Sequence, residues 1–330
     1  MKNRKSPIKI FLPVILGIII TGILIIPLFI PYPTGEYTEK QLADSDSRFI
    51  MVDGLSVHYK MYGTGKTVYI LLHGTLATTF TWRDIAKTLS EKGTVIAYDR
   101  PSFGLTSRPM ADEFDKSSPY GYEAQVNLLI HFMDALNVKH AVLIGNSMGG
   151  AIACMAAEQY PKRFDALVLV DPVQSRHALP VVVNFLAKTP QLRHMGVFYI
   201  HNNIKKFGNF LYPLSWHDKS KIKQEYCDEY FKIFKIKNFE QGLWEFLVAA
   251  RPLEKLLNPE NIKIPTLVIA GDDDRVAGIE HESTGTQDLI QLSQKIRNSR
   301  LVVIPDCGHI PQEECPAAFL QAVREFVSDL

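Results

Sequence analysis

The sequence lacks the features that would assign it to several functional classes. Its net charge is only +1 over 330 residues, so it has no concentrated basic excess of the kind that nucleic-acid-binding proteins carry. Its four cysteines are too few and too scattered for a disulfide framework, and no C-x-x-C pair indicates a zinc site. Repeats and low-complexity tracts are also missing. We therefore expect a globular protein without metal, cofactor or nucleic-acid partner; whether any cysteine pair is oxidised stays open.

One long hydrophobic run stands at the N-terminus. Residues 10–30 hold no charged side chain across 21 positions, which corresponds to about 30 Å of helix, the thickness of a bilayer core. The run predicts an uncleaved transmembrane anchor at 1–31 and a polar linker at 32–47; the alternative is a cleaved signal peptide. Basic residues before the run predict a single-pass membrane protein with a cytoplasmic N-terminus and an extracytoplasmic catalytic domain. These residues are Lys2, Arg4, Lys5 and Lys9.

After the linker, short apolar runs alternate with helical patterns. Residues 49–63 read as two strands around an Asp-Gly turn, which is typical of a hairpin. Continuous apolar runs that alternate with helices predict an α/β fold, with a mostly parallel sheet covered on both faces. In such sheets ligands bind beyond the carboxyl ends of the strands. The predicted strands lie at 67–74, 94–99, 140–145, 165–171, 265–271 and 300–306, and the helices at 82–92, 122–137, 148–160, 286–297 and 316–330.

The alternation stops between residues 173 and 264. This interval has a helical pattern, 14 of the 34 aromatic residues, and 14 Lys or Arg against 8 Asp or Glu. We interpret it as a helical cap inserted over the end of the sheet, which leaves 48–172 and 265–330 as the core. Its positive charge predicts a solvated helical surface, with contact to anionic lipid as the alternative.

A serine lies between glycines where a predicted strand meets a predicted helix. Ser147 is the middle residue of GNSMG and follows the run at 140–145. The plain interpretation is an ordinary helix N-cap. However, G-x-S-x-G between a strand and a helix is typical of a nucleophile on a sharp turn, with the positive end of the helix behind it. We therefore predict that Ser147 is a catalytic nucleophile.

A serine hydroxyl is a weak nucleophile, so acyl transfer needs a histidine base and an acid that orients it. His309 follows the run at 300–306 and a glycine, which places it at the same edge of the sheet. Asp274, the last of three adjacent aspartates after another strand, has the longest reach and is our predicted acid. Asp273 and Asp171 stay open as alternatives. The order Ser, Asp, His is the one that the fold requires.

Two backbone N–H groups should face the oxyanion that forms during acyl transfer. One is predicted to come from Met148, the residue after the nucleophile, and the other from the loop that follows the run at 67–74. In that loop we favour Thr75 over Leu76. We expect His73 to be a hydrogen-bonded structural histidine.

Together these motifs resemble those of the α/β-hydrolase superfamily. The resemblance implies an eight-stranded, mostly parallel sheet with helices on both faces, and a helical cap that matches the insertion. It carries the nucleophile onto Ser147, the acid onto Asp274 and the base onto His309. The matching segments lie within 48–330 and are HG at 73–74, DRPSFG at 99–104, GNSMGG at 145–150, GDDD at 271–274 and CGH at 307–309.

The sequence also departs from superfamily patterns. Ser102 stands where glycine is usual, which we expect to be harmless, and Gly278 stands where proline is frequent, which predicts a looser loop. Ser147 replaces the aspartate nucleophile of haloalkane dehalogenases and epoxide hydrolases, which argues against both chemistries. The elbow is similar to that of carbon–carbon bond hydrolases acting on ring-cleavage products. Those enzymes tend to have a Gly-Pro-rich oxyanion loop and a tryptophan where Ile310 stands here.

The sequence therefore predicts a membrane-anchored serine hydrolase that cleaves carboxylic esters, with apolar or lipid-like acyl groups favoured. Carbon–carbon bond or amide hydrolysis by the same triad is one alternative. A membrane-tethered binding module with a vestigial triad is the other. The sequence does not reveal the natural substrate, the acyl chain length or the oligomeric state.

Overall fold

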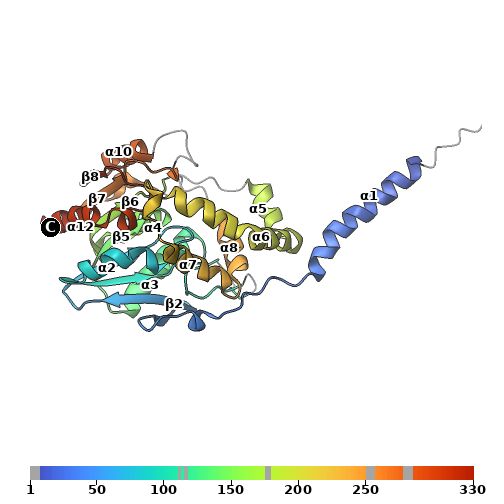
Figure 1. Cartoon of the computed structure of the whole chain (residues 1–330), viewed down its shortest axis with the longest axis horizontal. Coiled ribbons are helices and arrows are strands. Elements are labelled where there is room, and N and C mark those ends of the chain that lie inside the picture. Colours follow the sequence, from blue (N-terminus) through green and yellow to red (C-terminus); the bar gives the residue numbers. More distant parts are fainter. Residues whose placement is uncertain (1–7, 111–112, 115–117, 175–179, 250–256, 278–284) are drawn as a thin grey trace, which may run out of the picture.

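Eight strands form one sheet, and its central and C-terminal strands are parallel, as predicted (Figure 1). The order across the sheet is β1-β2-β4-β3-β5-β6-β7-β8. The β1–β2 and β2–β4 pairs are antiparallel and every other pair is parallel. The strands are β1 (Arg48–Val52), β2 (Leu55–Tyr62), β3 (Thr67–Leu72), β4 (Gly93–Tyr98), β5 (Ala141–Asn146), β6 (Phe164–Val170), β7 (Thr266–Gly271) and β8 (Ser299–Ile304).

The computed structural model describes residues 8–110, 113–114, 118–174, 180–249, 257–277 and 285–330. Gly278, for which a loose loop was predicted, lies outside these residues. The domain limits drawn from the sequence stay a prediction.

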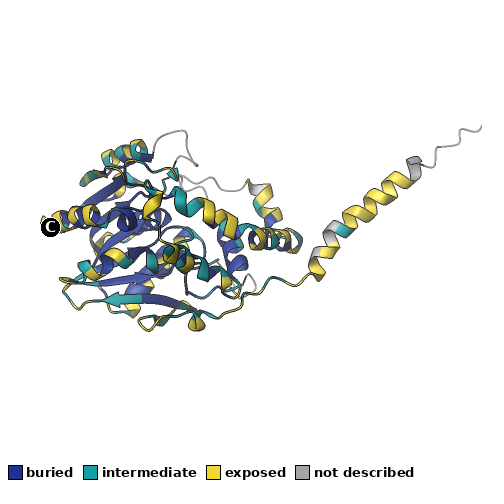
Figure 2. Ribbon diagram, in the orientation of Figure 1, coloured by how far each residue is buried: buried dark blue, intermediate teal, exposed yellow. Residues whose placement is uncertain are grey.

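Helices cover both faces of the sheet, which confirms the predicted α/β architecture. Alternate residues of one strand point to opposite faces: Leu143 joins one hydrophobic cluster, whereas Val142 and Ile144 join the other. Figure 2 shows the strands buried between the two layers. The first cluster includes residues of α3 (Tyr122–Ala135), α4 (Met148–Gln159) and α10 (Gly285–Lys295), and the second includes residues of α2 (Arg83–Leu89) and α12 (Pro316–Ser328).

Between β6 and β7 the chain forms helices, as its pattern predicts. We call the described residues 180–249 the cap. Its interior is part of a third hydrophobic cluster, which includes Phe239 and Phe246 of the cap and Phe103 of the core. The ring centroids of Phe103 and Phe246 lie 5.0 Å apart. The cap helices are α5 (Val181–Ala187), α6 (Pro190–Leu214), α7 (Gln224–Lys232) and α8 (Phe239–Ala249).

The segment before the first strand lies along the cap. Tyr37 forms a parallel bridge with Ile236, and backbone hydrogen bonds run from Glu36 N to Lys235 O (2.8 Å) and from Lys237 N to Tyr37 O (2.9 Å). A side chain on Gly35 would place its Cβ 2.2 Å from the backbone of Ile236. Glycine is therefore required for this close approach.

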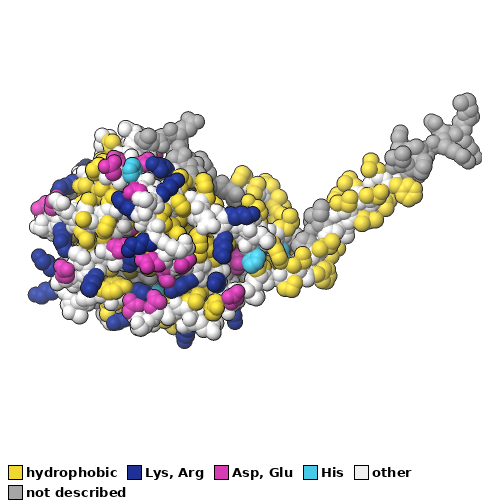
Figure 3. Space-filling view, in the orientation of Figure 1, with side chains coloured by type: hydrophobic (Ala, Val, Ile, Leu, Met, Phe, Trp, Pro, Cys, Tyr) yellow, Lys and Arg dark blue, Asp and Glu magenta, His cyan; other side chains and the backbone are white. Residues whose placement is uncertain are grey.

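The predicted membrane anchor is not borne out. The apolar run forms helix α1 (Ile8–Ile25) of 18 residues, and the 3-10 turn η1 (Ile26–Phe29), which contains Pro27, ends it. No helix among the described residues is both long and apolar enough to cross a membrane. The expected single-pass placement with an extracytoplasmic catalytic domain is therefore wrong. The helix projects from the rest of the chain with apolar side chains on its surface (Figure 3).

Ser102, which stands where the superfamily usually has glycine, has an unusual backbone conformation. Its φ is +79°, in the left-handed region that favours glycine. It is fully buried, and its hydroxyl has no hydrogen-bond partner within the described part of the chain. Both features lower the stability of the folded protein, so serine at this position has an energetic cost that glycine would not have.

Candidate active site

Ser147 lies on a sharp turn between β5 and α4. Its φ is +54° and its ψ is −122°, a conformation that side chains rarely adopt. The glycine two residues later is required, because a Cβ on Gly149 would lie 2.2 Å from Leu72 O. The carbonyl of Ser147 accepts hydrogen bonds from Gly150 N and Ala151 N, so the first turn of α4 is built directly on it. Backbone strain of this kind is typical of functional residues.

His309 and Asp274 form a close pair beyond the ends of β8 and β7. Nδ1 of His309 lies 2.7 Å from Oδ2 of Asp274. The other carboxylate oxygen of Asp274 accepts the backbone N–H groups of Val276 and Ala277, at 2.9 and 3.1 Å. Burial alone would raise the pKa of Asp274, but His309 and the two N–H groups outweigh it and lower the pKa below its ordinary value. An ionised Asp274 accepts the Nδ1–H, which leaves Nε2 of His309 free to take a proton.

The other two candidate acids have different partners. Asp273 faces the cap and pairs with His217 Nδ1 at 2.8 Å and with Arg275. Asp171 is buried, and Gly271 N donates to both of its carboxylate oxygens at 3.2 Å. Burial, followed by the charge of Asp274, raises the pKa of Asp171 well above its ordinary value. The geometry therefore pairs His309 with Asp274, not with either alternative.

A cavity of about 520 Å³ lies between the sheet and the cap, and Ser147, Asp274 and His309 all line it. Its size is typical of a small-molecule site. Thr75, Leu76 and Met148, the candidate oxyanion donors, line the same cavity. Its other wall comes from the cap and is rich in aromatic side chains, which are Tyr199, Phe207, Phe210, Tyr212, Tyr230, Phe231 and Phe234.

The loop that carries Thr75 is held from behind by buried polar groups. His73 donates from Nδ1 to Gly74 O (2.7 Å) and accepts Arg100 N at Nε2 (2.9 Å). The guanidinium of Arg100 donates to the carbonyls of both His73 and Gly74. Burial, and then Arg100, lower the pKa of His73 to about 3, so this histidine is neutral and structural, as expected. Gly74 lies against the predicted nucleophile, since a Cβ there would be 3.0 Å from Cβ of Ser147.

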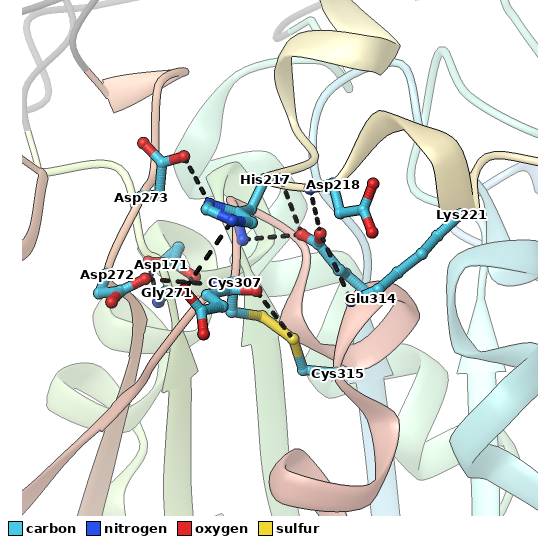
Figure 4. The surroundings of a disulfide bond; sticks show 12 residues. Asp171, His217, Asp218, Lys221, Gly271, Asp272, Asp273, Cys307, Glu314 and Cys315 are labelled. Carbon is cyan, nitrogen blue, oxygen red and sulfur yellow. Dashed lines mark hydrogen bonds and ion pairs between the residues drawn. A yellow bond between two sulfur atoms is a disulfide. The ribbon is translucent and has the colours of Figure 1, made fainter.

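Several residues that organise the site were not found from the sequence. Asn146 Nδ2 donates to His309 O at 3.1 Å and so joins the two catalytic loops. Glu314, at the end of the short helix α11 (Pro311–Glu314), binds the loop of His309 to the cap (Figure 4). Cys307 and Cys315 form a disulfide that encloses His309 in sequence. The one feature of the sequence that could have indicated this disulfide was a cysteine on each side of His309.

No group of three or more His, Cys, Asp or Glu side chains within the described ranges is arranged to hold a metal ion. What the site does contain is a strained serine, a histidine paired with a carboxylate, and backbone N–H groups on two adjoining loops. These are the components of acyl transfer through a serine nucleophile.

Comparisons with known proteins show the family of the chain. A family model described as the alpha/beta hydrolase fold matches residues 68–316. The uncharacterized hydrolase YugF of Bacillus subtilis is 30% identical over 293 residues, which cover 86% of this chain and 99% of the relative. The 2-hydroxy-6-oxo-2,4-heptadienoate hydrolase of Pseudomonas putida is 28% identical over 294 residues, which cover 85% and 96%. A thermophilic esterase from Thermogutta terrifontis has the same fold, with a TM-score of 0.67 at 22% identity over 86% of this chain and 99% of that chain. The chain therefore belongs to the alpha/beta hydrolase fold family.

Proposed function

We propose that the protein is a serine hydrolase that cleaves neutral carboxylic esters with apolar acyl groups. The observation that carries the proposal is the 2.7 Å pair of His309 with Asp274 in the cavity that exposes the strained Ser147. Membership of the hydrolase family supports hydrolysis as the reaction type, and the lining of the cavity supports a neutral ester with an apolar acyl group as the substrate class.

In the proposed mechanism, Oγ of Ser147 attacks the ester carbonyl while Nε2 of His309 takes the hydroxyl proton. Asp274 stabilises the imidazolium that forms. The N–H groups of Thr75 and Met148 donate to the negatively charged oxygen of the tetrahedral intermediate. The carbon–oxygen bond then breaks and the leaving alcohol takes the proton from His309. Water repeats the sequence on the acyl-enzyme, which releases the carboxylic acid and restores Ser147.

The charge of the cavity favours a neutral substrate. The described lining residues include no lysine or arginine. Besides His309 they include four carboxylic acids, which are Asp171, Asp274, Asp288 and Glu313. A substrate that carries a carboxylate would be desolvated beside these groups, and no lysine or arginine among the described lining residues would pair with it. A neutral ester avoids this cost, and its acyl chain would contact the aromatic wall.

Carbon–carbon bond hydrolysis is the second candidate, because the Pseudomonas putida relative is named for a heptadienoate. That compound is a carboxylate, so the described cavity lining, which contains no lysine or arginine, favours the neutral ester. The two candidates separate when the protein is assayed with p-nitrophenyl esters from acetate to palmitate and with a 2-hydroxy-6-oxo-dienoate.

We expect ester hydrolysis that depends on Ser147, with a chain-length optimum set by the cavity, and little turnover of the dienoate. Ser147→Ala is the matched variant, since it removes one hydroxyl. Faster turnover of the dienoate than of every ester would reverse the assignment. If neither substrate reacts and a fluorophosphonate does not label Ser147, the protein is not a hydrolase and the binding-module alternative takes its place.

A further inference from the structure

Glu314 is a carboxylate without exposed side-chain surface, and three backbone N–H groups point at it. Oε2 accepts Gly308 N at 2.8 Å and His217 N at 2.9 Å, and Oε1 accepts Asp218 N at 2.7 Å. Its only charged partner among the described residues is Lys221, whose Nζ lies 3.9 Å away and whose side chain is 46% exposed. Figure 4 shows the carboxylate between the cap segment and the His309 loop. Its binding energy therefore comes mainly from charge-assisted hydrogen bonds to backbone.

The three donors belong to two different parts of the molecule. His217 and Asp218 follow the end of α6 in the cap, whereas Gly308 immediately precedes the predicted catalytic base. A further bond connects the same two segments, because His309 N donates to Ser215 O at 2.9 Å. The backbones are so close that a Cβ on Gly308 would lie 2.4 Å from Ser215 O. Residues 215–218 thus lie directly on the loop that holds His309.

The same cap segment also reaches the loop of the predicted acid. His217 Nδ1 lies 2.8 Å from Oδ2 of Asp273, the residue before Asp274. Asp273 N in turn donates to Cys307 O at 3.0 Å, which ties the acid loop to the histidine loop. A displacement of residues 215–218 would therefore disturb both members of the His309–Asp274 pair.

We propose that Glu314 is a positioning residue that couples the seating of the cap to the placement of His309. The inference rests on the proposed function, in which His309 is the base. With the carboxylate in place, the cap segment at 215–218 and the loop of His309 are held in position together. Without it, the buried N–H of Gly308 and the half-buried N–H groups of His217 and Asp218 lose their acceptor, which loosens the cap segment from the loop of His309.

This role predicts an effect on the chemical step for every substrate, however small. A residue that only docks the cap would affect long-chain esters, which contact the cap, and would spare an acetate ester. Misplacing a catalytic group by about 1 Å costs on the order of 100-fold in rate. The test therefore compares two effects of a substitution at Glu314. One is the change in kcat for p-nitrophenyl acetate, and the other is the change in KM for a long-chain p-nitrophenyl ester.

Glu314→Gln is the main variant, because it keeps the shape but turns an NH₂ group towards backbone donors. We expect kcat for p-nitrophenyl acetate to fall about 10- to 100-fold. Glu314→Asp keeps both oxygens on a shorter side chain and should recover part of that loss. Lys221→Met is the matched control: it removes the charged partner but none of the three hydrogen bonds, so kcat should change less than about twofold.

Amide hydrogen exchange of the full chain provides a readout that needs no activity. In Glu314→Gln, exchange should rise together at residues 215–218 and at 307–310. An unchanged kcat for acetate, or faster exchange at 215–218 alone, would overturn the coupling and leave Glu314 as a cap-docking residue. Inactivity of the wild type on all esters would instead contradict the proposed function, and the exchange comparison would still decide whether Glu314 couples the two segments.

Discussion

The side-chain amide of Asn146 donates a hydrogen bond of 3.1 Å to the backbone carbonyl of His309. A second bond, to Val170 O at 3.1 Å, fixes the orientation of the amide. Asn146 immediately precedes Ser147, so a single buried side chain connects the loop of the predicted nucleophile with the loop of the predicted base. Asn146 thus helps to set the relative position of the two groups from the strand side of the cavity, as Glu314 does from the cap side.

We expect Asn146→Ala to lower kcat for p-nitrophenyl acetate about tenfold, because the variant loses both buried hydrogen bonds of the amide, and the loss of the bond to His309 O, at about 1–2 kcal/mol, loosens the His309 loop. Steady-state kinetics with acetate and a long-chain ester measures this. Asn127→Ala, which removes the exposed acceptor of the Tyr160 hydroxyl, is the control and should leave kcat unchanged. An equal lack of effect at both positions would show that Asn146 does not position His309.

Two aspartates that both line the cavity should differ in how strongly their replacement by asparagine lowers kcat. Asp274→Asn should reduce kcat by about 10³- to 10⁴-fold, because the amide no longer accepts the Nδ1–H of His309 and favours the wrong tautomer. Asp171→Asn replaces a carboxyl group whose pKa is raised with a neutral group of the same shape, and kcat should stay within tenfold. The reverse order in single-turnover assays would make Asp171 the acid.

The raised pKa of Asp171 also predicts how stability depends on pH. Above its ordinary value of about 3.8, the unfolded chain loses this proton while the folded protein keeps it. The unfolded state then binds fewer protons, so this group lowers the free energy of unfolding as pH rises. Asp171→Asn should therefore gain stability relative to wild type between pH 4 and pH 8, by urea denaturation. A difference between the two proteins that is the same at both pH values would contradict this.

Ser102→Gly should stabilise the protein by about 1 kcal/mol. A left-handed backbone costs residues other than glycine about 1–2 kcal/mol, and glycine removes this cost. Glycine also loses more conformational entropy on folding, but this opposes only part of the stabilisation. Ser102→Ala separates the two causes, because it removes the unpartnered hydroxyl but keeps the Cβ. Chemical denaturation of the three proteins gives the comparison. Destabilisation by glycine would show that the Ser102 hydroxyl has a partner in solution.

Cys315→Ser should reduce the free energy of unfolding by about 2–3 kcal/mol, the chain-entropy value for a bridge between cysteines eight positions apart. Thermal unfolding with and without a reducing agent tests this. The reductant should lower the melting temperature of the wild type towards that of the variant and leave the variant unchanged. A wild type that does not respond to reductant while its thiols are shown to be free would contradict the bridge.

Local patterns were enough to predict the secondary structure around the site. The apolar run at 140–145, followed by glycine and small residues, predicted β5, the turn at Ser147 and α4. Strand ends also predicted that His309 and the aspartates at 272–274 would meet, because parallel strands end at one edge. Reach from the end of the strand favoured Asp274, but the sequence could not exclude Asp273 or Asp171, since that depends on side-chain partners such as His217 of the cap.

The residues missed from the sequence act through contacts between distant segments. Asn146 and His309 are 163 positions apart, and Glu314 reaches donors 96 and 97 positions away. No periodicity records such pairs. The predicted anchor failed for a different reason: hydrophobicity alone could not show that the helix ends at Ile25, before Pro27.

Backbone hydrogen bonds between residues 35–37 and 235–237 attach the cap to the segment before β1, so the cap is not a freely hinged lid. Both ends of the insertion already join the sheet, and these hydrogen bonds add a third attachment from a segment that precedes every strand. A proteolytic nick between residues 37 and 48 would cut that tether while leaving the triad intact. For the proposed ester hydrolysis, a stretch of chain that contributes nothing to the chemistry would thus help to set which acyl groups the cavity admits.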